Sequence, residues 1–224
     1  MYSKKKVLLD SVVQVETDLD KIGIDPSVFK TAIEEGVRSF MREGESSAKS
    51  AAGYNAWNSI LKTLRQEVKL AKWGENFDSN GVEGVVSHLK KIVIIVNSGD
   101  SSTGIIDEIP RPKNQKGSGY TGLMHNNLEL IDSGFDLFEN NSVVADSIDP
   151  NQTWIFLYHI DKKNKQVRYE LSLPTNIKNK MIGGWKKRIM FTPLDISDTP
   201  IVTPNSDKEV ENNEIDFNVT RKSG

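Results

Sequence analysis

Apolar positions in the first third of the chain recur with the spacing of an α-helix. Asp25 followed by Pro26 is typical of a helix start, because Asp caps the first turn and proline fits the first helical position. One apolar stripe follows this start, at Val28, Phe29, Ala32, Ile33, Val37, Phe40 and Met41. A second stripe comprises Trp57, Ile60, Leu61, Leu64, Val68 and Ala71. Intervals of three and four therefore predict a helical region over residues 1–74, with its stripes packed together or on a sheet.

From residue 91 the pattern changes to a continuous apolar run. Lys91 is followed by Ile-Val-Ile-Ile-Val, and such a β-branched run is typical of a strand covered on both faces. A long loop, residues 97–122, follows this strand. A weaker helical pattern comes next, at Leu123, Leu130, Ile131, Phe135 and Phe138.

Two later apolar runs, near residues 153–173, are separated by a short polar turn and predict a β-hairpin. The proposed register places Asp161 opposite Gln166, which closes a four-residue loop. One side of the hairpin is then wholly apolar, with the pairs Ile160–Val167, Tyr158–Tyr169 and Phe156–Leu171. Slipping the register by one residue would put Arg168 and Glu170 among the core side chains, so that alternative is disfavoured.

The chain beyond the hairpin is less regular. Pro174 is expected to end the second strand, because it has no N–H to donate. A connection through Gly183 and Gly184 then leads to a third strand around 187–192. After Pro193 the sequence becomes polar, and residues 195–224 are predicted to form an acidic tail that is extended or disordered.

These patterns together predict an α+β fold. The N-terminal helical pair packs on a mostly antiparallel sheet that includes the hairpin, and residues 75–194 form the α+β body. Cysteine is absent from the 224 residues, which excludes disulfides, thiolate metal sites and a cysteine nucleophile. No apolar run reaches the roughly 18 residues of a membrane helix, and the start of the chain lacks the apolar core of a secretory signal. We therefore expect a cytoplasmic protein with no membrane partner.

Charge is distributed very unevenly along the chain. Residues 75–161 carry 5 basic and 13 acidic side chains, whereas residues 162–188 carry 9 basic side chains and a single acid. A basic block with neighbouring aromatic residues is typical of a surface that binds nucleic acid. The alternative is that lysines protect hairpin turns and edge strands from aggregation, while the acidic middle segment neutralises the block within the fold.

The loop after the apolar strand is a second place to look for an anion site. Neither the G-x-x-x-x-G-K-[ST] spacing nor G-x-G-x-x-G occurs in the chain, so the familiar nucleotide-binding loops are excluded. Its basic, glycine-rich second half can form an anion-binding nest, although Gly, Ser and Pro also build ordinary solvent loops. The predicted anion-binding or nucleic-acid-binding residues are Arg111, Lys113, Lys116, Lys162, Lys163, Arg168, Lys186, Lys187 and Arg188.

The polar side of the hairpin suggests catalysis as an alternative. The register pairs His159 with Arg168 and Leu157 with Glu170, and Asp100 follows the apolar strand. Acidic residues on adjacent strands hold Mg²⁺ in metal-dependent nucleases, so Asp100, His159 and Glu170 are the catalytic candidates. The lysine that usually follows the glutamate by two positions is replaced by Ser172. The other interpretation is a cross-strand ladder of ion pairs on a partly solvated face.

The preferred hypothesis is a non-enzymatic subunit that binds nucleic acid or a protein partner through a basic surface. The alternative is a metal-dependent nuclease or phosphoryl-transfer enzyme centred on Asp100 and Glu170, with Mg²⁺ as cofactor. Lysine outnumbers arginine by 22 to 7, which suggests an AT-rich, bacterial genome. The absence of housekeeping motifs favours a phage-defence or mobile-element protein.

Overall fold

The computed structural model describes residues 15–114, 117, 119–123, 127, 152–178 and 181–197. Lys116, most of the helical pattern beyond Leu123 and the tail beyond Ser197 lie outside the described residues.

The first part of the fold is helical, as predicted. A helical segment over residues 15–22 precedes α2 (Pro26–Met41) and α3 (Ala51–Leu70). The Asp25 side chain accepts the backbone N–H of Ser27 at 2.7 Å, which confirms the predicted cap. None of the helices in the described part of the chain has both the length and the apolar character that crossing a membrane requires.

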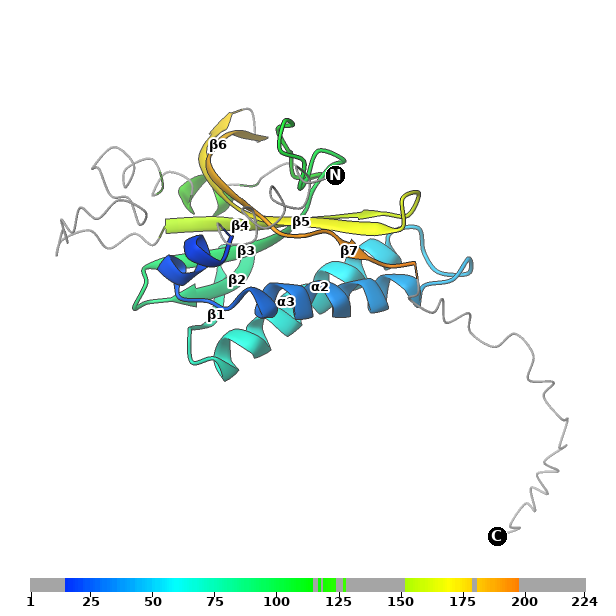
Figure 1. The fold of residues 1–224 in the computed structure, drawn as a ribbon, viewed down its shortest axis with the longest axis horizontal. Helices are drawn as coiled ribbons and strands as arrows, with labels where there is room; N and C mark the ends of the chain where they lie inside the picture. Colours follow the sequence, from blue (N-terminus) through cyan, green and yellow to red (C-terminus); the bar gives the residue numbers. More distant parts are fainter. Residues whose placement is uncertain are drawn as a thin grey trace, which may run out of the picture.

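The sheet contains seven strands in the order β1-β2-β3-β4-β5-β6, with β7 beside β5. Only β3 and β4 pair in parallel, so the predicted α+β fold with a mostly antiparallel sheet is confirmed. Helices α2 and α3 lie on one side of the sheet, and β6 bends away from it (Figure 1). The strands are β1 (Glu75–Ser79), β2 (Val82–Ser87), β3 (Ile92–Ser98), β4 (Gln152–Asp161), β5 (Gln166–Lys178), β6 (Met181–Met190) and β7 (Leu194–Asp195).

The main core lies between the helices and one face of the sheet. The Phe29 ring of α2 meets the Phe156 ring of β4 with centroids 4.9 Å apart. Indole N–H groups anchor the helices further, because Trp57 donates to the Val96 carbonyl at 3.1 Å and Trp73 donates to the Ile22 carbonyl at 3.0 Å. Most positions of the apolar stripes are therefore core positions, as expected from their periodicity, whereas Ala71 is exposed and Phe40 is only partly buried.

The predicted hairpin register is confirmed pair by pair. Asp161 lies opposite Gln166, Tyr158 opposite Tyr169, and His159 opposite Arg168. The wholly apolar side faces the helices and contributes to the main core. A two-residue periodicity with one apolar face leaves no other register that buries the same side chains.

The predicted end of the second strand is wrong, because β5 continues past Pro174 to Lys178. The pairing with β6 shifts register around Pro174. This irregularity accommodates a residue that has no N–H to donate to the neighbouring strand. Asn127 also bridges this point: its side-chain amide donates to the carbonyls of Thr153 and Pro174, and its oxygen accepts the Thr153 N–H. The predicted connection at Gly183 and Gly184 is likewise wrong, since both lie within β6.

A second hairpin, β1–β2, was not predicted. Its two-residue turn is Asn80-Gly81, and both residues have positive φ, 51° and 72°. Asn-Gly is the strongest short-range hairpin pattern, so the sequence contained the signal. The flanking residues 75–79 are too polar to suggest a strand by apolar periodicity alone.

Candidate nucleic-acid interface

The long loop after β3 folds back on itself and closes at a narrow neck. Gly99 and Pro112 form an antiparallel bridge there. The Asp100 N–H donates to the Arg111 carbonyl at 2.9 Å, and the Lys113 N–H donates to the Ser98 carbonyl at 3.0 Å. The loop therefore has two parts: a closed excursion over residues 99–112, and a second part that begins at Lys113, which is hydrogen-bonded to Ser98 at the end of β3.

Arg168 of β5 holds the beginning of the excursion. Its guanidinium donates to the Thr103 carbonyl at 2.9 Å and to the Ser101 carbonyl at 2.7 Å. The remaining terminal nitrogen contacts the Asp161 carboxylate at 3.1 Å. Because these donors are committed within the fold, Arg168 is a structural cation in this conformation.

Arg188 of β6 holds the other end of the excursion. It donates to the Ile105 carbonyl at 3.1 Å and to the Glu108 carbonyl at 2.6 Å. The same guanidinium binds both oxygens of Glu170, at 3.0 and 2.6 Å, in a bidentate pair. Trp185 adds a hydrogen bond from its indole N–H to the Pro110 carbonyl at 3.0 Å.

Glu170 is fully buried, with 0% of its surface exposed. Beyond the two bonds from Arg188, its oxygens accept the Ser172 hydroxyl at 2.7 Å and the Gly104 N–H at 2.8 Å. A carboxylate with four donors has its acceptor capacity filled. The excursion buries this side of the hairpin at Arg168, Glu170 and Ser172, whereas His159, nearer the turn, is only half-buried.

The other two catalytic candidates lie at the neck of the loop. The Asp100 carboxylate accepts the Ser102 N–H at 3.2 Å, which makes it a turn residue. Nδ1 of half-buried His159 lies 3.3 Å from the Gly99 carbonyl oxygen. Burial lowers the pKa of His159, and the charges of Lys113 and Arg168 lower that pKa further. Near neutral pH the imidazole is therefore uncharged.

Metal binding finds little support around these residues. Within the described ranges, no group of three or more His, Asp or Glu side chains is placed to hold a metal ion. Four hydrogen bonds from Arg188, Ser172 and Gly104 fill the acceptor sites of Glu170, and Asp100 accepts a hydrogen bond within its own turn. The geometry thus favours the ion-pair interpretation of the hairpin's polar side over the Mg²⁺ interpretation.

Four of the predicted cations are exposed at one end of the sheet. Because β3 and β4 are parallel, with Ser98 opposite Tyr158, the neck after β3 and the turn after β4 lie at the same end. Lys162 in that turn is exposed, and its amine lies 4.6 Å from the centre of the Phe40 ring. We call these exposed cations the basic rim: Arg111, Lys113, Lys162 and Lys163.

The remaining predicted cations are distributed differently. Lys187 pairs with Asp18 at 2.8 Å, which ties β6 to the first helical segment. Lys186 is exposed on β6. Lys165 was missed by the prediction, although it is exposed in the same turn as Lys162 and Lys163.

Known proteins give no guide to this surface. Comparison of the chain with family models, curated proteins and solved structures returns no match. The function is therefore inferred from the geometry alone.

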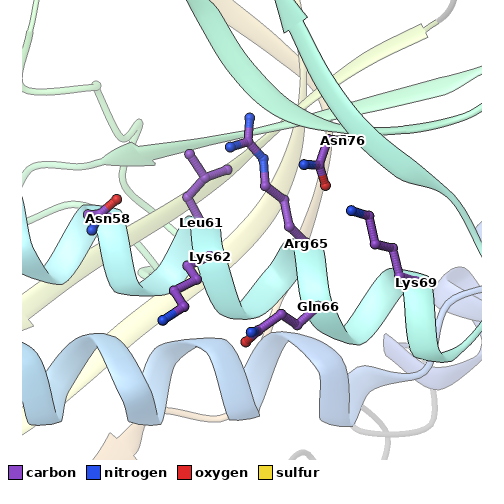
Figure 2. Close-up of a pocket in the computed structure, with 7 residues that line it drawn as sticks. All are labelled: Asn58, Leu61, Lys62, Arg65, Gln66, Lys69 and Asn76. Carbon is purple, nitrogen blue, oxygen red and sulfur yellow. The ribbon is translucent and has the colours of Figure 1, made fainter.

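A shallow cleft along α3 is a further feature that sequence reasoning missed (Figure 2). Its volume is about 340 Å³. Arg65 is held at its wall by the carbonyls of Gly84 and Phe77, at 3.1 and 3.0 Å, and by the Glu83 carboxylate at 3.0 Å. The lining residues are Asn58, Leu61, Lys62, Arg65, Gln66, Lys69 and Asn76. The sequence signal was the polar side of α3, where cations recur at intervals of three and four.

Proposed function

We propose that this chain is a non-enzymatic module that binds nucleic acid through the basic rim. The observation that carries the proposal is the parallel pairing of β3 and β4, which supports a shared position for the loop cations and the turn lysines. Exposed lysines on flexible stems suit contacts to phosphates, whose release of counterions supplies most of the sequence-independent affinity.

The buried part of the basic block supports the same proposal indirectly. Arg168 and Arg188 organise the loop from inside, so the neck that carries Arg111 and Lys113 is held in place. A preorganised surface loses less entropy on binding. The expected phage-defence or mobile-element setting is compatible with a protein that binds nucleic acid without cutting it.

The test is fluorescence anisotropy with labelled oligonucleotides of random sequence, at salt concentrations from low to physiological. We expect the double variant Lys113→Glu/Lys163→Glu to bind at least tenfold more weakly than the wild type at low salt. The slope of log affinity against log salt should also fall by about one for each phosphate that the variant no longer neutralises.

A matched control reverses two charges elsewhere. Lys30 on α2 and Lys72 after α3 are both exposed, and Lys30→Glu/Lys72→Glu makes the same change in net charge. We expect this control to retain most of the wild-type affinity. Equal losses in the two variants, or no binding by the wild type at low salt, would contradict the proposal.

A further inference from the structure

An exposed aromatic side chain stands at the start of α3. Tyr54 has 62% of its surface exposed. Its ring lies 5.9 Å from the ring of Trp57, at a tilt of 43°. Trp57 is itself fixed by its hydrogen bond to the Val96 carbonyl. Tyr54 is therefore an exposed ring on an anchored aromatic support.

This ring lies near the same end of the sheet as the basic rim. Val96 belongs to the last part of β3, and Lys113 is hydrogen-bonded to Ser98, two residues further along that strand. The first turns of α3 and the neck of the loop are thus hydrogen-bonded to neighbouring residues of β3. An aromatic face and exposed cations are available to one ligand.

The cleft along α3 extends from this end toward β1. Asn58, Lys62 and Gln66 follow Tyr54 at intervals of four, one helical turn apart. Figure 2 shows Lys62 and Gln66 leaving one side of α3, while Arg65 and Lys69 rise toward Asn76. The seven lining residues include three cations and no carboxylate.

Only part of the positive charge that lines the cleft is neutralised by ion pairs. Glu83 on β2 pairs with Arg65 at 3.0 Å. In the described part of the chain, no comparable ion pair forms at Lys62 or Lys69. These two amines remain available for an anionic ligand, and the amide groups of Asn58 and Gln66 can donate to its oxygens.

We propose that the ligand is a single-stranded nucleic acid, with a base stacked on Tyr54 and the backbone following the cleft toward Lys69. This inference rests on the proposed function and names its substrate class. Single strands expose base faces for stacking on aromatic side chains, whereas a duplex hides those faces within its own stack. An exposed ring one helical turn before a groove with unneutralised cations is the combination that single-strand binding uses.

The first test compares Tyr54→Ala with Tyr54→Phe by anisotropy on a labelled oligothymidylate and on a duplex of equal length. Stacking of one base on an aromatic side chain is worth about 1–3 kcal/mol. We expect Tyr54→Ala to weaken single-strand binding roughly 5- to 150-fold, at about 1.4 kcal/mol per tenfold. Tyr54→Phe keeps the ring and should stay within about twofold of the wild type, and duplex binding should be unaffected by either variant.

The second test concerns the cleft itself. We expect Lys62→Glu/Lys69→Glu to weaken single-strand binding and to lower the salt slope by about 1.4, since two phosphates of a single strand are no longer neutralised. The control is again Lys30→Glu/Lys72→Glu. Circular dichroism and thermal unfolding confirm that each variant is folded, which is expected because every substituted side chain is exposed.

The outcomes separate the two proposals. If rim variants abolish binding but the Tyr54 and cleft variants bind like the wild type, the single-strand inference is overturned and the proposed function stands. Tighter binding of the duplex than of the single strand also overturns the inference. If the wild type binds neither probe at low salt, the proposed function itself fails.

Discussion

The basic block, residues 162–188, contains two kinds of cation: arginines that are bound within the fold and lysines that are exposed to solvent. Arg168 and Arg188 point to the face of the sheet that the loop excursion covers, and their donors bind backbone carbonyls and carboxylates. Lys162 and Lys163 occupy the turn between β4 and β5 and are exposed. A planar guanidinium can satisfy several fixed acceptors at once, whereas a lysine amine is a flexible point charge that is easily left in water.

The comparison shows that a count of charges does not measure a binding surface. Residues 162–188 carry a net charge of +8, yet the two arginines and Lys187 are used within the fold. Whether a cation is buried or exposed depends on its position along the strand and on which segment covers that face of the sheet. Substitutions at buried and exposed positions should therefore have very different effects.

The largest effect is expected at the buried pair. Removing the Glu170 carboxylate leaves Arg188 unpaired beneath the loop, and breaking a buried ion pair costs about 3–5 kcal/mol. We therefore expect Glu170→Ala to lower the free energy of unfolding by that amount in urea denaturation. By contrast, Lys163→Glu in the turn should change it by less than about 0.5 kcal/mol.

A double variant sharpens this result. Replacing both partners by apolar side chains, in Glu170→Leu/Arg188→Met, removes the unpaired charge and should cost less than Glu170→Ala alone. The carbonyls of Ile105 and Glu108 lose their donor in this variant, so some loss remains. A double variant less stable than the single one would mean that the loop bonds, not the ion pair, dominate.

The next effect concerns the backbone of the loop excursion. Gly104 has φ of +71°, and a Cβ there would lie 2.9 Å from Cβ of Arg168. Gly104→Ala is therefore expected to cost about 1–3 kcal/mol. Gly53 on α3 is the control: a Cβ there meets nothing within 4 Å, so Gly53→Ala should raise helix stability by about 0.5–1 kcal/mol. Equal effects at the two glycines would refute the strain argument.

Truncation of the acidic C-terminal segment tests whether the basic rim is free to bind nucleic acid in the full chain. The chain beyond Ser197 carries six acids and three basic residues, and it leaves the fold beside the rim, where the Ile196 N–H donates to the Lys165 carbonyl at 2.9 Å. A tethered acidic segment has a high effective concentration at a nearby basic surface. Truncation after Ser197 should raise nucleic-acid affinity severalfold at low salt, and the gain should vanish at high salt. Unchanged affinity at low salt would contradict this prediction.

The smallest effect is the pH dependence at His159. Its folded-state pKa is lowered, mainly by burial, so the unfolded chain binds the proton more strongly. Stability contributed by neutral His159 is present above its unfolded pKa of about 6.5 and declines as the pH falls below that value. His159→Gln should remove this decline, as urea denaturation at several pH values would show.

Lys113 gives an independent check on the same group. Its charge contributes to the lowered pKa of His159. In Lys113→Glu the pKa of His159 should therefore rise, measured by NMR titration of the imidazole. A pKa that does not respond would place Lys113 away from His159 in solution.

Much of the fold could be predicted from the sequence. Helices α2 and α3, strand β3 and the β4–β5 hairpin follow from apolar periodicity, and the hairpin register follows because a slip would bury Arg168 and Glu170. The β1–β2 hairpin was missed because its strand residues are polar, although Asn80-Gly81 marked its turn. The path of β5 past Pro174 is bridged by hydrogen bonds of Asn127, a contact between distant segments that no local pattern encodes.

The candidate site shows the same division. Local sequence determined which residues are basic, which strand positions share a face and where the turns lie, because these depend on two-residue and 3.6-residue periodicities. Only the tertiary structure decided that β3 and β4 are parallel, that the loop excursion covers Glu170 and Arg188, and that α3 carries a cleft that begins at Asn58, one turn after Tyr54. Those outcomes depend on which elements pack against each other, and packing joins residues whose separation in sequence leaves no periodic trace.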